Sequence, residues 1–545
     1  MEAAMNTDAW NQPPEFAPRD LWHDDVALRE ALQREGGGAW QASVADYGAL
    51  AGDRLYALGF DANRDRPRLR THDRFGHRID RVEFHPHYHA LMDASIGRGV
   101  AGLSWREPAN GVHVARAALS YLHHQAEAGT SCPLTMTHAA VPVLARESRL
   151  QPWVDGIRAC AYDPDDVPAT HKRGLTVGMG MTERQGGSDV RSNLTRAMPL
   201  QADGEYLLQG HKWFFSAPMS DGFLVLAQAP GGLSCFLLPR WRPDGIRNAF
   251  RLMRLKDKLG DWANASSEVE FDDAWAVRIG DEGRGVSTIL GMVMLTRLDC
   301  MLGAAAQMRM ALAHAVHHVR HRHAFGRELV AQPLMRNVLA DLVLEAEAAL
   351  ALALRVARAV DAAPRDADEA AFARIATAIG KYWICRRAPA VVNEAQECLG
   401  GAGYIEESIL PRLYRQAPLN SIWEGSGNVQ CLDVLRALAR EPASGAALRA
   451  ELQAGAGRDD SYDIALAALL AEIDASTDPQ TREFTARRLV ERLALQLQAA
   501  VLLGAGNPLA RMFCCSRLAG DHGLALGTLP AGHDTDIVLA RALPD

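Results

Sequence analysis

The feature that most constrains the fold of this chain is an abrupt change of residue pattern between about residues 174 and 283. Short runs there alternate apolar and polar residues and are interrupted by Gly, Pro and Asp, as in "GEYLLQGHKWFFSA", "DGFLVLAQA", "LSCFLLPRW" and "SSEVEFDDAWAV". Alternation with period two is typical of half-buried strands. The segment "APGGLS" between two of these runs predicts a hairpin turn. We therefore expect a compact β-domain over 174–283.

The segments on both sides of this β-domain carry apolar residues at helical spacing. A chain of 545 residues is also too long for one core and should divide into roughly three or four domains. The expected class is α+β, in the order helices, β-domain, helices, helices. The predicted segments are an extended N-terminal arm (1–40), a helical domain (41–173), the β-domain (174–283), a helical bundle (284–440) and a C-terminal helical extension (441–545).

Composition excludes several classes of protein. The hydrophobic fraction of 48% and the mean hydropathy of −0.12 are those of an ordinary globular protein. No uninterrupted run of about 18 apolar residues predicts a membrane span, and no basic-then-apolar start predicts a signal peptide. Nine scattered cysteines without CxxC spacing are typical of a reducing cytoplasm, where we expect the protein. A net charge of −8 gives no whole-chain case for nucleic-acid binding.

The two commonest nucleotide-binding loops, GxGxxG after a strand and GxxxxGK[ST], are absent from the sequence. A different glycine-rich segment, "GMTERQGGSDVRSN" at 180–193, opens the β-domain. Its adjacent glycines let a ligand approach the backbone closely, and its hydroxyl and N–H groups offer hydrogen bonds. A tight turn in which Asp189 is a cap would have the same composition.

Three consecutive aromatic residues occur in "GHKWFFSAP" at 210–218, followed by Ser216. Successive residues of a strand face opposite sides, so these rings cannot all point the same way. At least one ring should meet a flat ligand or another domain.

A single carboxylate, Glu424, lies in the turn "SIWEGSGNVQ" at 421–430, between Trp423 and a Gly-Ser-Gly run. An apolar pattern resumes after the turn at Val429, Leu432, Leu435 and Leu438, which predicts a helix. An acid placed at the start of a helix would interact favourably with the helix dipole, which is the structural alternative to a catalytic role.

Two histidine-rich segments, "HPHYH" (85–89) and "HHVRHRH" (317–323), resemble metal ligands in composition. No Cys or carboxylate spacing accompanies them, so we expect no metal site. The arginines of "ARRLVERL" in the last segment are typical of a solvated or interfacial helix face.

Four of these motifs together resemble the acyl-CoA dehydrogenase superfamily. "GMTERQGGSDVRS" at 180–192 fits its first signature, and "ECLGGAGYIEESILPRLYRQ" fits the second except at Gln416. "RHAFG…Q" resembles its arginine–phenylalanine flavin-contact segment, and "IWEGSGN" resembles its catalytic-glutamate turn. The resemblance covers at least residues 41–440. The particular residues of these motifs, together with the C-terminal extension, resemble more narrowly the AidB-type flavoproteins of the adaptive response to DNA alkylation.

The resemblance implies FAD, bound non-covalently between the β-domain and the helical domain. It implies that Phe214 lies over the isoalloxazine, where the family usually has tryptophan, and that Ser216 lies near the reactive flavin nitrogen. The other implied cofactor contacts in the same subunit are Met181, Thr182, Gly187, Ser188, Trp423, Gly425, Ser426 and Asn428. Contacts to the FAD of a neighbouring subunit are implied for Arg322, Phe325, Gln332, Gly400 and Gly401, so a homotetramer is expected.

Glu424 is then the expected catalytic base, which removes the proton alpha to the thioester of an acyl-CoA. Some family members carry this base on a different helix. Burial near Trp423 should raise the pKa of Glu424 toward working pH.

The AidB-type resemblance also implies binding of double-stranded DNA through the C-terminal extension, together with weak acyl-CoA dehydrogenase activity. Residues 441–545 hold nine arginines and fourteen acids, a net charge of −5, so contact with DNA would need a local cluster of arginine. The candidates are Arg436, Arg487, Arg488, Arg492, Arg511 and Arg517. Two alternatives stay open: a catabolic acyl-CoA dehydrogenase for short or branched substrates, or a flavoprotein whose extension serves only assembly.

Overall fold

The computed structural model describes residues 11–475 and 478–543, which form two compact units. The first unit combines the described residues up to 54 with 113–125 and those from 300 onward. The second combines 55–112 with 126–299. The expected N-terminal helical domain (41–173) is therefore divided between the two units.

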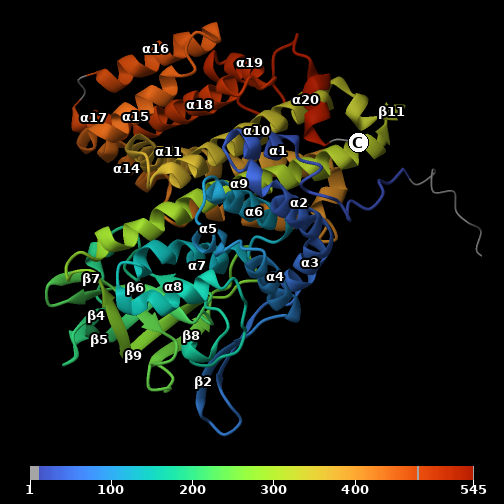
Figure 1. Cartoon of the computed structure of the whole chain (residues 1–545). Coiled ribbons are helices and arrows are strands. Elements are labelled where there is room, and N and C mark those ends of the chain that lie inside the picture. The colour runs from blue at the N-terminus through green and yellow to red at the C-terminus, as the bar shows by residue number, and fades with distance from the viewer. Residues whose placement is uncertain (1–10, 476–477, 544–545) are drawn as a thin grey trace, which may run out of the picture. The chain divides into compact units, whose positions relative to one another are not determined.

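The second unit contains a closed β-barrel. In ring order, β6 (Gly222–Ala229), β4 (Arg196–Pro199), β5 (Glu205–Ser216), β9 (Ser266–Ile279) and β7 (Gly232–Pro239) pair in sequence, and β7 returns to pair with β6. Two further strands extend the ring, β3 (Val177–Gly180) alongside β6 and β8 (Phe250–Leu255) alongside β9. Figure 1 shows β4 to β9 gathered in this unit. Closure leaves few unpaired strand edges exposed.

The core of the barrel consists of the inward-facing residues of these strands. This core contains the buried phenylalanines Phe215, Phe223, Phe236, Phe250 and Phe271. Alternation on β5 places Leu208 and Phe215 inside, while Gln209 and Phe214 face outward. The expected "APGGLS" hairpin is present, since Ala229 of β6 pairs with Gly232 of β7.

Helices and a hairpin complete the second unit. The hairpin of β1 (Arg68–His72) and β2 (Arg78–Glu83) lies in a segment that was predicted to be helical. The helices are α3 (Tyr56–Arg64), α4 (Pro86–Gly97), α5 (Leu103–Arg106), α7 (Ser131–Leu144) and α8 (Gln151–Arg158).

The first unit is helical and is built around two long helices, α10 (Pro333–Ala362) and α11 (Ala367–Cys398), which pack against each other. The C-terminal helices pack on this pair, and Figure 1 shows α15 and α18 beside α11. The remaining helices of this unit are α1 (Val26–Arg34), α2 (Gln41–Leu50), α6 (Val112–Ala126), α12 (Leu410–Gln416), α13 (Leu419–Ile422), α14 (Gly427–Arg440), α15 (Pro442–Gln453), α16 (Asp460–Asp474), α17 (Pro479–Phe484), α18 (Ala486–Gly504), α19 (Ala510–Phe513) and α20 (Thr535–Ala542).

The expectation of an extended N-terminal arm is wrong for its second half, because α1 lies within it; residues 1–10 lie outside the described residues. Asp25 caps α1 by accepting a hydrogen bond from the backbone N–H of Leu28 at 2.9 Å. Leu28 and Leu32 are fully buried, and α1 packs on α10. Tertiary burial of this apolar stripe outweighs the Pro and Gly residues around it, on which the expectation rested.

Helix α9 (Gly285–His321) is the one described helix that is long and apolar enough to cross a membrane by length and composition. Of its most apolar stretch, 83% is buried within the protein, and core helices of soluble proteins pass the same test.

Candidate active site

The glutamate turn adopts an unusual backbone conformation. Glu424 has φ of 58° and Gly425 has φ of 95°, so two successive residues lie in the left-handed region. Glycine enters this region freely, whereas a glutamate does so at a cost of roughly 1–2 kcal/mol. The turn separates α13 from α14, and the Glu424 side chain is half-buried. Such strain in a non-glycine residue is concentrated at functional sites in proteins.

A buried lysine holds this turn in place. Lys381 of α11 is 1% exposed, and its Nζ donates hydrogen bonds to the carbonyl oxygens of Trp423 at 2.8 Å and Gly425 at 2.6 Å. The two carbonyls lie on either side of Glu424, so the ammonium group fixes the residue from both directions. Gln430 of α14 adds hydrogen bonds from its amide to the carbonyls of Glu424 and Gly425, at 3.2 and 2.9 Å.

Lys381 is not among the functional residues predicted from the sequence. A usable signal is present, however, because this lysine stands alone in the apolar segment "IATAIGKYWIC" of a chain that has only five lysines. A lysine in such surroundings is buried only when its charge is compensated.

Helix α14 starts directly after the turn, as expected, but it buries a different face. Its buried residues include Gln430, Cys431, Val434 and Ala437, whereas Leu432 is 41% exposed. At the start of α14, Ser426 makes no side-chain capping hydrogen bond. The side chain of Asn428 instead accepts a hydrogen bond from Nε of Arg487 at 2.8 Å. Arg487, expected to contact DNA, thus lies beside the expected cofactor turn.

In the second unit, the glycine-rich loop after β3 is anchored to the barrel by a buried ion pair. Glu183 and Lys212 are both fully buried, with Oε1 and Nζ 2.7 Å apart. Burial alone would raise the pKa of Glu183, but the Lys212 ammonium and hydrogen bonds from Thr195 and Leu194 outweigh burial and lower this pKa to about 2. The carboxylate is therefore ionised and holds the loop at neutral pH.

The residues expected to contact the flavin lie on the accessible side of this anchored loop. Met181, Thr182 and Gly187 are half-buried and Ser188 is exposed. A Cβ atom on Gly187 would lie 2.5 Å from Oγ1 of Thr182, so a side chain at 187 would displace that hydroxyl. The loop thus requires glycine at 187 and keeps its hydroxyl groups accessible.

The aromatic triplet on β5 divides between the two faces of the barrel wall, as the strand geometry predicted. Phe215 is fully buried in the barrel core, whereas Phe214 is 53% exposed. The Lys256 ammonium lies 3.6 Å from the ring centre of Trp213 and 4.6 Å from that of Phe214. At the end of β5, the hydroxyl of Ser216 is hydrogen-bonded to that of Ser266 at 3.0 Å. Strand β5 therefore carries both the exposed ring of Phe214 and the hydroxyl of Ser216 near its end.

The residues expected to bind a neighbouring subunit's cofactor lie at two exposed places in the first unit. Phe325 and Gly326 form the two-residue turn between β10 (His323–Ala324) and β11 (Arg327–Glu328), with φ of 52° and 79°. Phe325 is 96% exposed. Both φ values are positive, which is the pattern of a type I′ turn.

The side chains near this hairpin serve to hold it. Arg322 donates a hydrogen bond to the backbone oxygen of Asn11, and the Gln332 amide donates to the carbonyl of Ala324 at 3.0 Å. At the second place, after α11, added Cβ atoms on Gly400 and Gly401 would meet no atom of the described residues within 4 Å. Close approach of a ligand is possible there.

The six arginines expected to contact DNA differ in accessibility. Arg517 is buried between Asp341 and Glu345, with 3.0 Å to Glu345, so its guanidinium does not reach the surface and this expectation is wrong. Arg492 pairs with Glu472, and Arg436 lies 3.8 Å from Asp433 while remaining mostly exposed. Among the described residues, only two of the six, Arg488 and Arg511, are exposed and form no ion pair or hydrogen bond.

The histidine-rich segments have structural contacts. His85 caps α4 by accepting a hydrogen bond from the backbone N–H of His87, and His317 Nε2 contacts the carbonyl of Pro14 at 2.8 Å. No group of three or more His, Cys, Asp or Glu among the described residues could hold a metal ion. All nine cysteines are free thiols, and eight of them are buried.

A helical domain, a β-barrel and a helical bundle with a glutamate turn define the architecture of an acyl-CoA dehydrogenase. Three adjoining regions match family descriptions. Residues 11–164 match "Adaptive response protein AidB N-terminal domain", 178–274 match "Acyl-CoA dehydrogenase, middle domain", and 283–439 match "Acyl-CoA dehydrogenase, C-terminal domain". The chain belongs to the acyl-CoA dehydrogenase family, whose members are oxidoreductases acting on CH–CH groups and typically depend on FAD.

The relatives agree with this assignment. The chain is 47% identical to AidB of Escherichia coli (strain K12) over 93% of both chains. It is 32% identical to acyl-CoA dehydrogenase family member 11 of Caenorhabditis elegans, over 76% of this chain and 70% of the relative. The crystal structure of C. elegans ACDH-11 in complex with C11-CoA is similar with a TM-score of 0.86, at 27% identity over 95% of this chain and 94% of the other.

Proposed function

We propose that this protein is an AidB-like FAD flavoprotein of the adaptive response to DNA alkylation, with weak acyl-CoA dehydrogenase activity and sequence-tolerant binding of double-stranded DNA. The observation that carries the enzymatic part is the conformation of Glu424, which Lys381 fixes through its two neighbouring carbonyls. The similarity to E. coli AidB over nearly the whole length supports the particular branch of the family.

The residues of the β-barrel unit fit FAD. Phe214 offers an exposed aromatic surface, and Trp213 beside it is half-buried. The loop anchored by Glu183 presents hydroxyl groups over a backbone that requires glycine at 187. A flat ring system and a diphosphate need these two kinds of group. When bound, FAD supplies the acceptor for the hydride that leaves the β-carbon of the substrate.

We propose that Glu424 removes the α-proton of the acyl-CoA thioester. A carboxylate acts as a base when it is ionised and held within hydrogen-bonding distance of the proton. The turn holds the carboxylate in position, since Lys381 and Gln430 bind the backbone oxygens of residues 423–425 by hydrogen bonds. A rigid backbone limits the positions that the carboxylate can reach, which raises its effective concentration at the substrate.

We propose further that the protein is a homotetramer in which Arg322, Phe325, Gln332, Gly400 and Gly401 contact the FAD of another subunit. The strained and almost fully exposed Phe325 supports this proposal, because an exposed apolar ring in a left-handed turn contributes nothing to the stability of its own chain. Other large apolar side chains of the same unit are also exposed, among them Leu334, Tyr404 and Ile405.

A catabolic acyl-CoA dehydrogenase is the second candidate function. It is favoured by the internal use of arginine in the C-terminal extension. Arg517 and Arg541 pair with carboxylates of α10, and Arg355 of α10 pairs with Glu369 and Glu451. These ion pairs suit an extension that stabilises the assembly. The C11-CoA bound to the C. elegans structure is consistent with either candidate.

The test is anaerobic titration of the purified yellow protein with a panel of acyl-CoA thioesters, followed by flavin absorbance. Slow bleaching is expected for the AidB-like function, and rates of a dedicated enzyme would favour the catabolic alternative. In Glu424→Gln, we expect the flavin to remain bound and bleaching to fall by at least about a thousandfold, as for loss of an essential base.

The matched control is Glu407→Gln, which removes an exposed carboxylate of the same unit and should bleach like the wild type. An unchanged rate in Glu424→Gln would refute the role of this base. A colourless, correctly assembled protein that takes up no FAD would refute the proposed function as a whole.

A further inference from the structure

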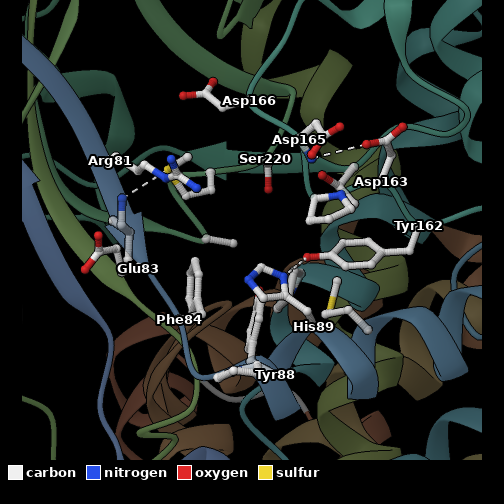
Figure 2. Close-up of a pocket in the computed structure, with 18 residues that line it drawn as sticks. Arg81, Glu83, Phe84, Tyr88, His89, Tyr162, Asp163, Asp165, Asp166 and Ser220 are labelled. Carbon is white, nitrogen blue, oxygen red and sulfur yellow. Dashed lines mark hydrogen bonds between the residues drawn. The ribbon is translucent and has the colours of Figure 1, made fainter.

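A cavity of about 470 Å³ lies in the second unit, and none of the residues expected to bind FAD or substrate is part of its lining. It is bounded by β2, by the start of α4, by residues 162–166 and by the connection between β5 and β6 (217–220). Figure 2 shows its lining side chains. The volume is in the range of small-molecule sites, at the lower end, and is small for a dinucleotide.

One wall of this cavity is made of stacked rings. Phe84 and Tyr88 lie parallel, with ring centres 4.1 Å apart and an angle of 11° between their planes. His89 continues the wall, with its ring centre 5.5 Å from that of Tyr88, and Tyr162 follows it. A flat apolar body would stack on these rings.

His89 provides a polar group within the aromatic wall. Its Nδ1 is hydrogen-bonded to the Tyr162 hydroxyl at 2.8 Å, and its Nε2 forms no hydrogen bond to a described residue. Burial and the nearby charge of Arg81 lower the pKa of His89, so the ring is neutral at pH 7. The imidazole can therefore exchange a hydrogen bond with a ligand but adds no charge to the cavity.

Most acids of the lining are already neutralised by arginines outside it. Glu83 pairs with Arg70 at 2.8 Å, and Asp163 lies 3.6 Å from Arg173. Asp166 binds Arg240 and Arg247, both at 2.8 Å. Because these carboxylates already have arginine partners, they do not require a cationic ligand.

Two charged groups of the lining form no ion pair with a described residue, Arg81 and Asp165. Figure 2 shows them on opposite sides of the cavity. The charge of Arg81 lowers the pKa of His89. The charge of Arg81 favours a negative group near the aromatic wall, while the exposed Asp165 disfavours ligands with several negative charges.

We infer that this cavity binds a small organic monoanion with a flat apolar body, such as an aromatic carboxylate. The carboxylate pairs with the Arg81 guanidinium, and the ligand ring packs against the stacked pair of Phe84 and Tyr88. His89 Nε2 supplies a further hydrogen bond. The fork of a guanidinium matches a carboxylate with two parallel hydrogen bonds, which favours this anion over a halide.

The test is calorimetric titration of the full-length protein with benzoate and with its neutral isostere benzamide. We expect benzoate to bind at least tenfold more tightly than benzamide. In Arg81→Gln, benzoate affinity should fall by about tenfold and benzamide affinity should stay unchanged, while Arg81→Lys should restore part of the loss.

The matched control is Arg74→Gln, which removes an exposed arginine from the same β1–β2 hairpin outside the cavity. It should bind benzoate like the wild type. Equal affinities for benzoate and benzamide, no benzoate binding at millimolar concentrations, or undiminished benzoate binding by a folded Arg81→Gln protein would each overturn the inference. Benzoate bound at the proposed flavin site would be indifferent to Arg81→Gln, so the outcome is independent of the proposed function.

Discussion

At the scale of single residues, buried lysines hold several parts of this protein in place. Lys172 and Lys212 form buried ion pairs with Asp221 and Glu183, and the buried Lys381 binds only backbone carbonyls by hydrogen bonds. Lysine has a compact charge that two or three oxygens can satisfy inside a protein. Buried arginines such as Arg517 take a similar role, so burial of the cation rather than its type marks these internal positions.

We expect Lys381→Met to impair the reaction without loss of the flavin. The substitution removes both hydrogen bonds that hold the Glu424 turn, and misplacement of a catalytic group by about 1 Å costs roughly a hundredfold in rate. The bleaching rate at saturating acyl-CoA should fall 10- to 100-fold. Hydrogen exchange of residues 423–427, measured by mass spectrometry, should become faster.

Lys172→Met is the control for Lys381→Met, because it removes a buried lysine of the other unit. It should lower thermal stability without a selective loss of rate or faster exchange in the turn. Wild-type exchange at 423–427 in Lys381→Met would contradict the positioning role of Lys381.

The Glu183–Lys212 pair predicts an acid-sensitive contribution to stability. The pKa of Glu183 is about 2 in the folded protein and about 4.5 when the residue is exposed. A lowered pKa means that the unfolded state takes up a proton first, so this stabilisation is complete above about pH 4.5 and is lost as the pH falls toward 2. Thermal midpoints of the wild type and of Glu183→Gln/Lys212→Met should therefore converge between pH 4.5 and 3.

The double variant avoids a buried, unpaired lysine, which would itself be strongly destabilising. Midpoints that fall in parallel over this pH range would show that the pair contributes no such stabilisation.

At the scale of elements, the sequence predicted the strands of the barrel better than the short elements outside it. Alternation along β5 and β9 is local information, and it placed the barrel and the β6–β7 hairpin correctly. Helix α1 and the β1–β2 hairpin were missed, since α1 depends on burial of Leu28 and Leu32 against α10, three hundred residues later. The Glu424 turn was recognised from its motif, but Lys381 lies on another helix and is brought there only by folding.

The β10–β11 hairpin allows a test of assembly. Replacement of Phe325 by Gly removes an exposed ring and relieves a left-handed conformation worth about 1 kcal/mol, so the isolated chain should not be destabilised. If the ring contacts another subunit's cofactor, Phe325→Gly should lower the mass measured by light scattering at micromolar concentration and release FAD more readily.

Phe75→Gly is the matched control for Phe325→Gly, because Phe75 is also an exposed phenylalanine in a hairpin turn. It should retain both mass and flavin. The same mass and flavin content in Phe325→Gly as in the wild type would contradict the proposed contact.

At the scale of the whole molecule, charge distribution decides between DNA binding and a purely structural extension. The extension has a net charge of −5, and several of its arginines form ion pairs within the protein, such as Arg449–Asp474 and Arg492–Glu472. DNA binding depends on the local surface potential rather than on the net charge of a segment. The exposed and unpaired Arg488 and Arg511 are therefore the best remaining candidates for phosphate contacts.

Retardation of a random 30-base-pair duplex by the full-length protein measures this contribution. Each phosphate contact adds about 0.9 to the slope of log affinity against log salt, so Arg488→Gln/Arg511→Gln should lower that slope by about 2. Arg449→Gln/Arg492→Gln changes the net charge equally but removes only arginines that are already paired, and it should leave the slope nearly unchanged. Equal effects of the two double variants would mean that total charge, and not a surface of this extension, governs binding. No retardation even at low salt would leave the extension a structural part of the enzyme, held to α10 by the Arg517 and Arg541 ion pairs.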